Sequence, residues 1–105
     1  MKKIECVIRP EKFEAVREAL RKSGAGGMTT YEVGGFGNQR ARGRGLIKRL
    51  KLEIYVDDFQ AESVIDIVMK AARTGVGETG DGKIAVFDLE RLYRIRTGEE
   101  GAKAV

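Results

Sequence analysis

Apolar residues change their spacing twice along this chain, from every second residue to one stripe of a helix. The first change lies at Pro10: residues 2–9 alternate as a β-strand does, and residues 11–22 carry a helical apolar stripe. The second lies at Asp58, a suitable helix N-cap: residues 51–56 alternate, and the clearest helical stripe of the chain follows. Two such strand–helix units indicate a domain that mixes helices with a sheet.

Three further segments complete the predicted topology. Residues 28–33, rich in threonine and tyrosine, predict a second strand that runs into a long loop, and residues 83–89 and 92–95 predict β segments after the second helix. The order β-α-β, long loop, β-α-β is that of the ferredoxin-like βαββαβ sandwich, an α+β fold with helices on one face of an antiparallel sheet. With 105 residues, we expect a single domain over 1–105.

The sheet face opposite the helices is expected to mix apolar and polar side chains: Val7, Tyr31, Val33 and Tyr55. Such a face is too apolar to be fully exposed to solvent without cost and too polar to form a hydrophobic core. We therefore expect the chain to associate with copies of itself through this face.

The residue inventory excludes several classes of protein. With no histidine and a single cysteine, Cys6, the chain offers no zinc site of the usual composition and no catalytic triad built on histidine. We find no stretch near the roughly 18 consecutive apolar residues that span a bilayer. The start Met-Lys-Lys-Ile-Glu lacks the apolar core of a signal peptide, so we expect a cytoplasmic protein.

Two groups of residues in the last third of the chain could bind phosphate. The run 80–83, Gly-Asp-Gly-Lys, joins flexible backbone N–H groups to a cation, although its spacing is not that of a Walker A motif. Arg94 and Arg96, on a predicted strand, would point to the same face and could contact two phosphate oxygens. Lys83 and the two arginines lie in one hairpin-length segment, which predicts that they converge on a polyphosphate. A plain loop and a solvated strand edge are the alternatives.

The long loop is the most basic segment of the chain. Residues 38–51 include no acidic side chain and these cations: Arg40, Arg42, Arg44, Lys48, Arg49 and Lys51. Such a cluster attracts phosphates, RNA, lipid head groups or an acidic protein surface, or is simply solvated. Just before it, the glycines of 34–37 favour a flexible hinge when taken alone; the alternative is that they allow a ligand to approach closely, with Gln39 binding a hard cation or a polar ligand group.

Five stretches in register resemble the PII family of nitrogen-regulatory signal transduction proteins, over nearly the whole chain. They begin at Gly27, Gly35, Lys70, Gly80 and Arg94, and read Gly-Met-Thr, Gly-Phe-Gly followed by Gln39, Lys-Ala-Ala-Arg-Thr-Gly, Gly-Asp-Gly-Lys-Ile and Arg-Ile-Arg-Thr-Gly-Glu. The resemblance implies a homotrimer that binds ATP or ADP, with AMP as a third candidate, in the clefts between subunits. It also implies a T-loop, here about 37–50, that docks onto a transporter or an enzyme.

The resemblance also assigns site residues. Those implied for the nucleotide are Gly27, Met28, Thr29, Gly35, Phe36, Gly37, Glu53, Gly80, Asp81, Gly82, Lys83, Arg94 and Arg96. The end of the phosphate-binding loop, about 74–83, would hold phosphates, and the arginines of the C-terminal segment 94–105 would do so from the adjoining subunit. Gln39 is implied for Mg²⁺ and Arg49 for a small anionic effector. The cations implied for the target protein are Arg40, Arg42, Arg44 and Lys48.

The chain departs from the family pattern in the loops. The T-loop is shortened and lacks the tyrosine that some members have uridylylated, so covalent control there is not expected. Arg49 stands where the family has a lysine that holds 2-oxoglutarate, which makes bicarbonate an alternative to 2-oxoglutarate. The phosphate-binding loop is slightly longer, and its added Glu78 would weaken or reshape nucleotide binding unless a cation lies between.

These observations predict a regulatory protein and not an enzyme: the nucleotide would shift the basic loop between conformations that a target distinguishes. The main alternative is an RNA-binding module of the RRM type, which shares this order of elements. Against it, the third strand offers only Tyr55 where an RRM stacks bases on paired aromatic residues. An enzyme of the acylphosphatase or nucleotide-hydrolysing type is a third class, but no motif positions a general base.

Overall fold

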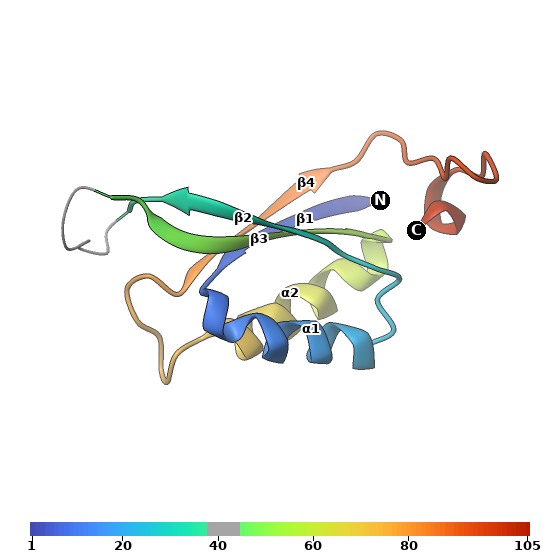
Figure 1. The fold of residues 1–105 in the computed structure, drawn as a ribbon. Coiled ribbons are helices and arrows are strands. Elements are labelled where there is room, and N and C mark those ends of the chain that lie inside the picture. The colour runs from blue at the N-terminus through green and yellow to red at the C-terminus, as the bar shows by residue number, and fades with distance from the viewer. Residues whose placement is uncertain (38–44) are drawn as a thin grey trace.

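The structure is a computed structural model that describes residues 1–37 and 45–105. Its main elements are β1 (Lys2–Ile8), α1 (Phe13–Lys22), β2 (Thr29–Gly35), β3 (Ile47–Val56), α2 (Asp58–Ala72) and β4 (Gly82–Asp88). The strands form one antiparallel sheet in the order β2-β3-β1-β4, and both helices cover the same face of it (Figure 1). The predicted α+β ferredoxin-like fold is therefore confirmed.

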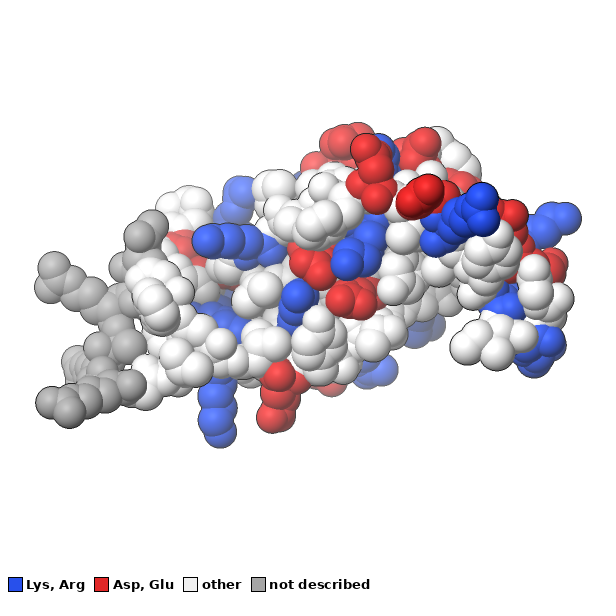
Figure 2. Space-filling model, turned by 90° about the horizontal axis from the view of Figure 1, so that it is seen from above, with Lys and Arg blue, Asp and Glu red and all other residues white. Residues whose placement is uncertain are grey.

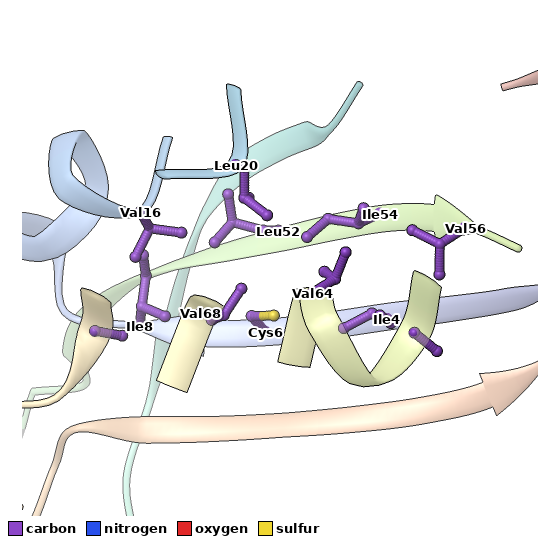
Figure 3. Packing of buried hydrophobic residues seen from close by; sticks show 12 residues of the cluster. Ile4, Cys6, Ile8, Val16, Leu20, Leu52, Ile54, Val56, Val64 and Val68 are labelled. Carbon is purple, nitrogen blue, oxygen red and sulfur yellow. The ribbon is translucent and has the colours of Figure 1, made fainter. Parts of the chain in front are cut away.

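The core lies between this sheet and the two helices. The predicted alternation in β1 buries Ile4, Cys6 and Ile8; side chains of β3 lie beside them in the sheet, and those of α1 and α2 cover them (Figure 3). Burying a large aliphatic side chain contributes about 1.5–3 kcal/mol. Burial also raises the pKa of Cys6 to about 12, aided by neighbouring Glu5, so this residue packs as a small hydrophobic group.

The ladder between β2 and β3 is longer than the sequence predicts. β3 begins at Ile47 and not at residue 51, and β2 runs on to Gly35, which pairs with Ile47. Cross-strand hydrogen bonds thus extend into the segment that charge alone marks as a loop, because a strand tolerates cations on its exposed face. As a result, Lys48 and Arg49 lie on a strand.

The prediction of a strand at 92–95 is wrong. Tyr93 forms only an isolated bridge with Glu100, and the N–H of Arg94 donates to the carbonyl of Glu99 at 2.9 Å. The N–H of Gly98 then donates to the carbonyl of Arg94 at 2.7 Å, and Gly98 takes a φ of 72° that favours glycine. These local bonds use the backbone groups that a strand would need, so strand alternation does not orient Arg94 and Arg96.

Both helix starts differ from the prediction in detail. α1 begins at Phe13, because residues Pro10–Lys12 form a turn of 3-10 helix. In α2 the N-cap is Asp57, and Asp58 occupies the first turn, where its carboxylate accepts a hydrogen bond from the N-terminal amino group at 2.8 Å. No helix in the described part of the chain is long and apolar enough to cross a membrane.

Candidate functional site

One open cleft of about 570 Å³ lies between the base of the long loop and the loop of about 74–83, which the sequence predicts as the phosphate-binding loop. The ends of β2 and β3 form one wall, the turn into β4 forms the other, and Val7 of β1 lies between them. The predicted site residues that line this cleft are Gly35, Phe36, Gly37, Arg49, Gly80, Asp81, Gly82 and Lys83. The structure therefore brings together two motifs that are more than 40 residues apart in sequence.

The turn into β4 depends on two glycines in conformations that other residues rarely adopt. Gly80 has a φ of 97° and Gly82 a φ of 114°. A Cβ atom at Gly82 would also overlap the carbonyl oxygen of Val7, because β4 starts in close contact with β1. Glycine is therefore required where the chain enters the strand that carries Lys83.

Asp81 organises the phosphate-binding loop from within. Its Oδ2 accepts hydrogen bonds from the backbone N–H groups of Glu78 at 2.8 Å and Thr74 at 3.0 Å. These bonds, with a contribution from Arg9, hold the pKa of Asp81 well below its usual range. The carboxylate thus stays charged and closes the loop, which leaves Lys83 as the cation that this loop presents to the cleft.

The other predicted nucleotide residues lie at the opposite end of the sheet. Thr29 pairs with Glu53, six ladder positions from the pair of Gly35 and Ile47, which corresponds to about 20 Å at about 3.3 Å per residue. The carboxylate of Glu53 accepts a hydrogen bond from the Tyr31 hydroxyl at 3.2 Å. Gly27 and Met28 directly precede this end of β2.

Arg94 belongs to this distant group and not to the cleft. Its guanidinium donates to the carbonyl of Val105 at 2.7 Å, and Val105 packs against Gly26. The C-terminal segment follows the far end of β4 from Lys83 (Figure 1). Within one chain, therefore, Lys83 does not meet Arg94 or Arg96.

Several predicted residues lie outside the described residues: Gln39, Arg40, Arg42 and Arg44. Lys48 is exposed on β3. Arg49 lines the cleft and donates from its guanidinium to the carbonyl of Lys48 at 2.8 Å.

The sequence analysis missed a charge network on the open face of the sheet. Glu5 lies 3.2 Å from the ammonium of Lys3 and 3.3 Å from that of Lys51, and the Lys51 ammonium lies over the ring of Tyr31 at 5.7 Å. Figure 2 looks onto this face and shows acidic and basic side chains interspersed with uncharged ones. Alternation along β1 places Lys3 and Glu5 on one face, whereas the pair of Glu5 with Lys51 could be indicated only by the register of β1 against β3, which places Val7 opposite Lys51.

Arg9 was also missed. It directly follows β1, whose last residue, Ile8, pairs with Gly82, and its guanidinium contacts the phosphate-binding loop at Thr79 and Asp81. A cation placed between a strand and a proline was the available signal, but sequence alone does not show that it faces a loop 70 residues away.

Comparison with known proteins gives one consistent family. Residues 1–99 match the family model described as nitrogen regulatory protein P-II. The chain is 47% identical to the nitrogen regulatory protein P-II of Nostoc punctiforme, 46% to that of Pasteurella multocida and 44% to nitrogen regulatory protein P-II 1 of Escherichia coli, with all of both chains covered. Each alignment spans 114 positions, nine more than the 105 residues here.

Proposed function

The chain belongs to the nitrogen regulatory protein P-II family of signal-transduction regulators, and we propose that it binds an adenine nucleotide between neighbouring copies of itself and signals to a target protein. The nucleotide is ATP or ADP, with AMP as a third candidate, and the protein acts in the cytoplasm. The relatives are named regulatory proteins, which supports regulation without catalysis.

The cleft carries the proposal. It combines the backbone of a turn that has glycine in a left-handed conformation at 80 and 82 with the ammonium of Lys83. Backbone N–H groups and an ammonium both suit phosphate oxygens. No ion pair joins Lys83 to a carboxylate among the described residues, so its charge is available to an anion. The phosphates of the nucleotide would bind here.

The division of the site supports binding between subunits. In one chain the cleft lies about 20 Å from the group around Thr29 and Glu53, at about 3.3 Å per ladder position. A ring of three copies would set the cleft of one subunit against the distant group of the next, where Gly27, Met28, Thr29 and Glu53 would contact the base and sugar. Arg94 and Arg96 would approach the phosphates from that second subunit.

The open face of the sheet supports the ring. Its central carboxylate, Glu5, is paired with both Lys3 and Lys51, so a second copy could cover this part of the face without burying Glu5 as an unpaired charge. The exposed aromatic side chains Tyr31 and Phe87 add apolar surface. A homotrimer is the assembly that we propose.

A second ligand would bind beside the nucleotide. Arg49 supplies a cation in the cleft for a small anion, with 2-oxoglutarate and bicarbonate as the two candidates. In the described part of the chain no group of three acidic or cysteine side chains could hold a metal. Mg²⁺ would therefore depend on Gln39 and on the phosphate oxygens of the nucleotide.

The basic loop and the start of β3 would contact the target, a transporter or an enzyme with an acidic surface, through Arg40, Arg42, Arg44 and Lys48. RNA binding is the weaker alternative. In β3, Tyr55 is the one aromatic residue, where an RRM stacks bases on paired aromatic side chains.

Isothermal titration with ATP, ADP and AMP, each with and without Mg²⁺, 2-oxoglutarate or bicarbonate, tests the proposal. We expect micromolar binding that one anion alters. Lys83→Ala should weaken ATP binding by about tenfold or more, since a hydrogen bond to a charged group contributes about 1.5–3 kcal/mol. Lys22→Ala, at the exposed end of α1, is the matched control and should bind normally. Equal affinity of the Lys83→Ala variant and wild type would refute the assignment of the cleft.

A further inference from the structure

The side chain of Arg9 lies behind the phosphate-binding loop and ties it to the end of β1. Its Nε donates to Oδ1 of Asp81 at 3.1 Å, and its Nη2 donates to the carbonyl of Thr79 at 2.9 Å. The Arg9 side chain is 16% exposed and that of Asp81 is 18% exposed. The hydrogen bond to the Asp81 carboxylate is charge-assisted, and the one to Thr79 is to a neutral carbonyl. In this largely buried position both bonds are stronger than they would be in water.

Asp81 links Arg9 to the rest of the loop through hydrogen bonds of both its carboxylate oxygens. One of its oxygens faces Arg9, and the other accepts the N–H groups of Thr74 and Glu78. The start, middle and end of the loop are therefore joined to one guanidinium through one carboxylate. If Arg9 were removed, Asp81 would lose its cation while its carboxylate stayed sheltered from water.

Arg9 also lies near the second acidic residue of the loop, Glu78. The carboxylate of Glu78 lies 4.0 Å from Nη2 of Arg9, and that of Glu11 lies 3.9 Å from Nη1. Glu78 lines the same cleft as Lys83. Without a cation beside it, this carboxylate would repel an anion that enters the cleft.

We propose that Arg9 is a positioning residue for anion binding in this cleft: it holds the phosphate-binding loop in shape and offsets part of the negative charge of Glu78. Arg9 itself is not among the described residues that line the cleft, so it acts through the loop. The inference deepens the proposed function and rests on it, because it concerns the same cleft and the same class of ligand, a polyphosphate.

The two roles predict different patterns. Loss of loop shape alone would weaken all nucleotides about equally. Loss of the balance to Glu78 would weaken binding more for the ligand with the larger negative charge, so ATP should suffer more than AMP. Removal of the Glu78 charge in the same molecule should then restore part of the ATP affinity, because the unbalanced carboxylate would be gone.

The experiment compares wild type with Arg9→Ala, Arg9→Lys, Glu78→Gln and the double variant Arg9→Ala/Glu78→Gln. Amide hydrogen exchange without ligand reports on the loop, and titration with ATP, AMP and inorganic tripolyphosphate reports on the cleft. The control is Arg17→Ala, which breaks an exposed pair with Glu14 on α1. Arg9→Lys keeps the charge and serves as the second variant if Arg9→Ala does not fold.

In Arg9→Ala we expect the amides of Thr74 and Glu78 to exchange about tenfold faster or more, while the core strands keep their protection. ATP affinity should fall by about tenfold, and AMP affinity by less, for a lost charge-assisted contact. The Glu78→Gln change in this background should recover part of the ATP loss, and Arg9→Lys should fall between wild type and Arg9→Ala.

Unchanged loop exchange together with unchanged ATP affinity in a folded Arg9→Ala variant would overturn the inference. If wild type binds tripolyphosphate but no nucleotide, the proposed function fails, and the tripolyphosphate affinity of Arg9→Ala decides the role of Arg9. If wild type binds neither ligand, both proposals fall.

Discussion

The two faces of the sheet are built from the same strands by different means. On the covered face, Ile4 and Ile54 lie opposite each other and are fully buried under the helices, and among the described residues no polar side chain is buried. On the open face, Glu5 lies between Lys3 and Lys51. The covered face stabilises the single chain, and the open face is the one that we propose a second copy covers.

The largest effect should follow from a cavity in the covered face. Ile54→Ala should lower the free energy of unfolding by about 2–5 kcal/mol, because it removes a fully buried side chain and leaves a void. Urea unfolding at fixed protein concentration measures this, since assembly would make stability depend on concentration.

The matched control for that variant is Ile95→Ala. Ile95 is fully exposed in the turn of the C-terminal segment, so its loss should change the free energy of unfolding by less than about 0.5 kcal/mol in the absence of assembly. Similar losses in the two variants would contradict the assignment of the core.

A smaller effect, on the strength of self-association, should follow from a change on the open face. Glu5→Gln leaves Lys3 and Lys51 without their shared carboxylate, so covering this face would bury two uncompensated cations. We expect self-association to weaken by roughly tenfold while the fold of each chain persists. Sedimentation equilibrium over a range of protein concentrations measures the change.

Glu18→Gln is the control for assembly. It breaks a pair of similar chemistry, with Arg21 at 2.6 Å, but on the surface of α1. Its self-association should match wild type. Weakened assembly in both variants would show that total charge matters and not the composition of the open face.

The covered face could be predicted from the sequence, and most of the open face could not. Alternation at Ile4, Cys6 and Ile8 is a local pattern, and local patterns identify a buried face before any contact is known. The pairing of Glu5 with Lys51 depends on the register of strands far apart in the chain, which apolar spacing does not fix for charged residues.

The candidate site divides in the same way. The glycines of 35–37 and 80–83 were predicted to share a ligand, and they line one cleft. The expected strand at Arg94 failed because the turn closed by Gly98 forms its own hydrogen bonds, which a propensity for strand does not register. Arg9 escaped notice because its partners, Thr79 and Asp81, are about 70 residues away.

The smallest expected effect is a pH dependence of stability. It should distinguish Glu5, on the open face of the sheet, from Glu18, on the exposed surface of α1. Partial burial raises the pKa of Glu5, but hydrogen bonds from Lys3 and Lys51 outweigh it, so the pKa lies below its ordinary value of 4.5. A carboxylate with a lowered pKa in the folded protein stabilises it above the ordinary pKa, and this contribution is lost as the pH falls through the folded value.

Wild type should therefore exceed Glu5→Gln in urea midpoint at pH 7, and the difference should shrink once the pH falls below 4.5. Glu18 also has a lowered pKa, because of its hydrogen bond from Arg21, but water screens that exposed pair, so the Glu18→Gln difference should be smaller at every pH. A difference for Glu5→Gln that stays constant from pH 7 to pH 3 would mean that lost packing, and not lost charge, accounts for it. In that case the charge of Glu5 would contribute nothing to the free energy of unfolding, and the open face would stabilise the chain by packing alone, as the covered face does.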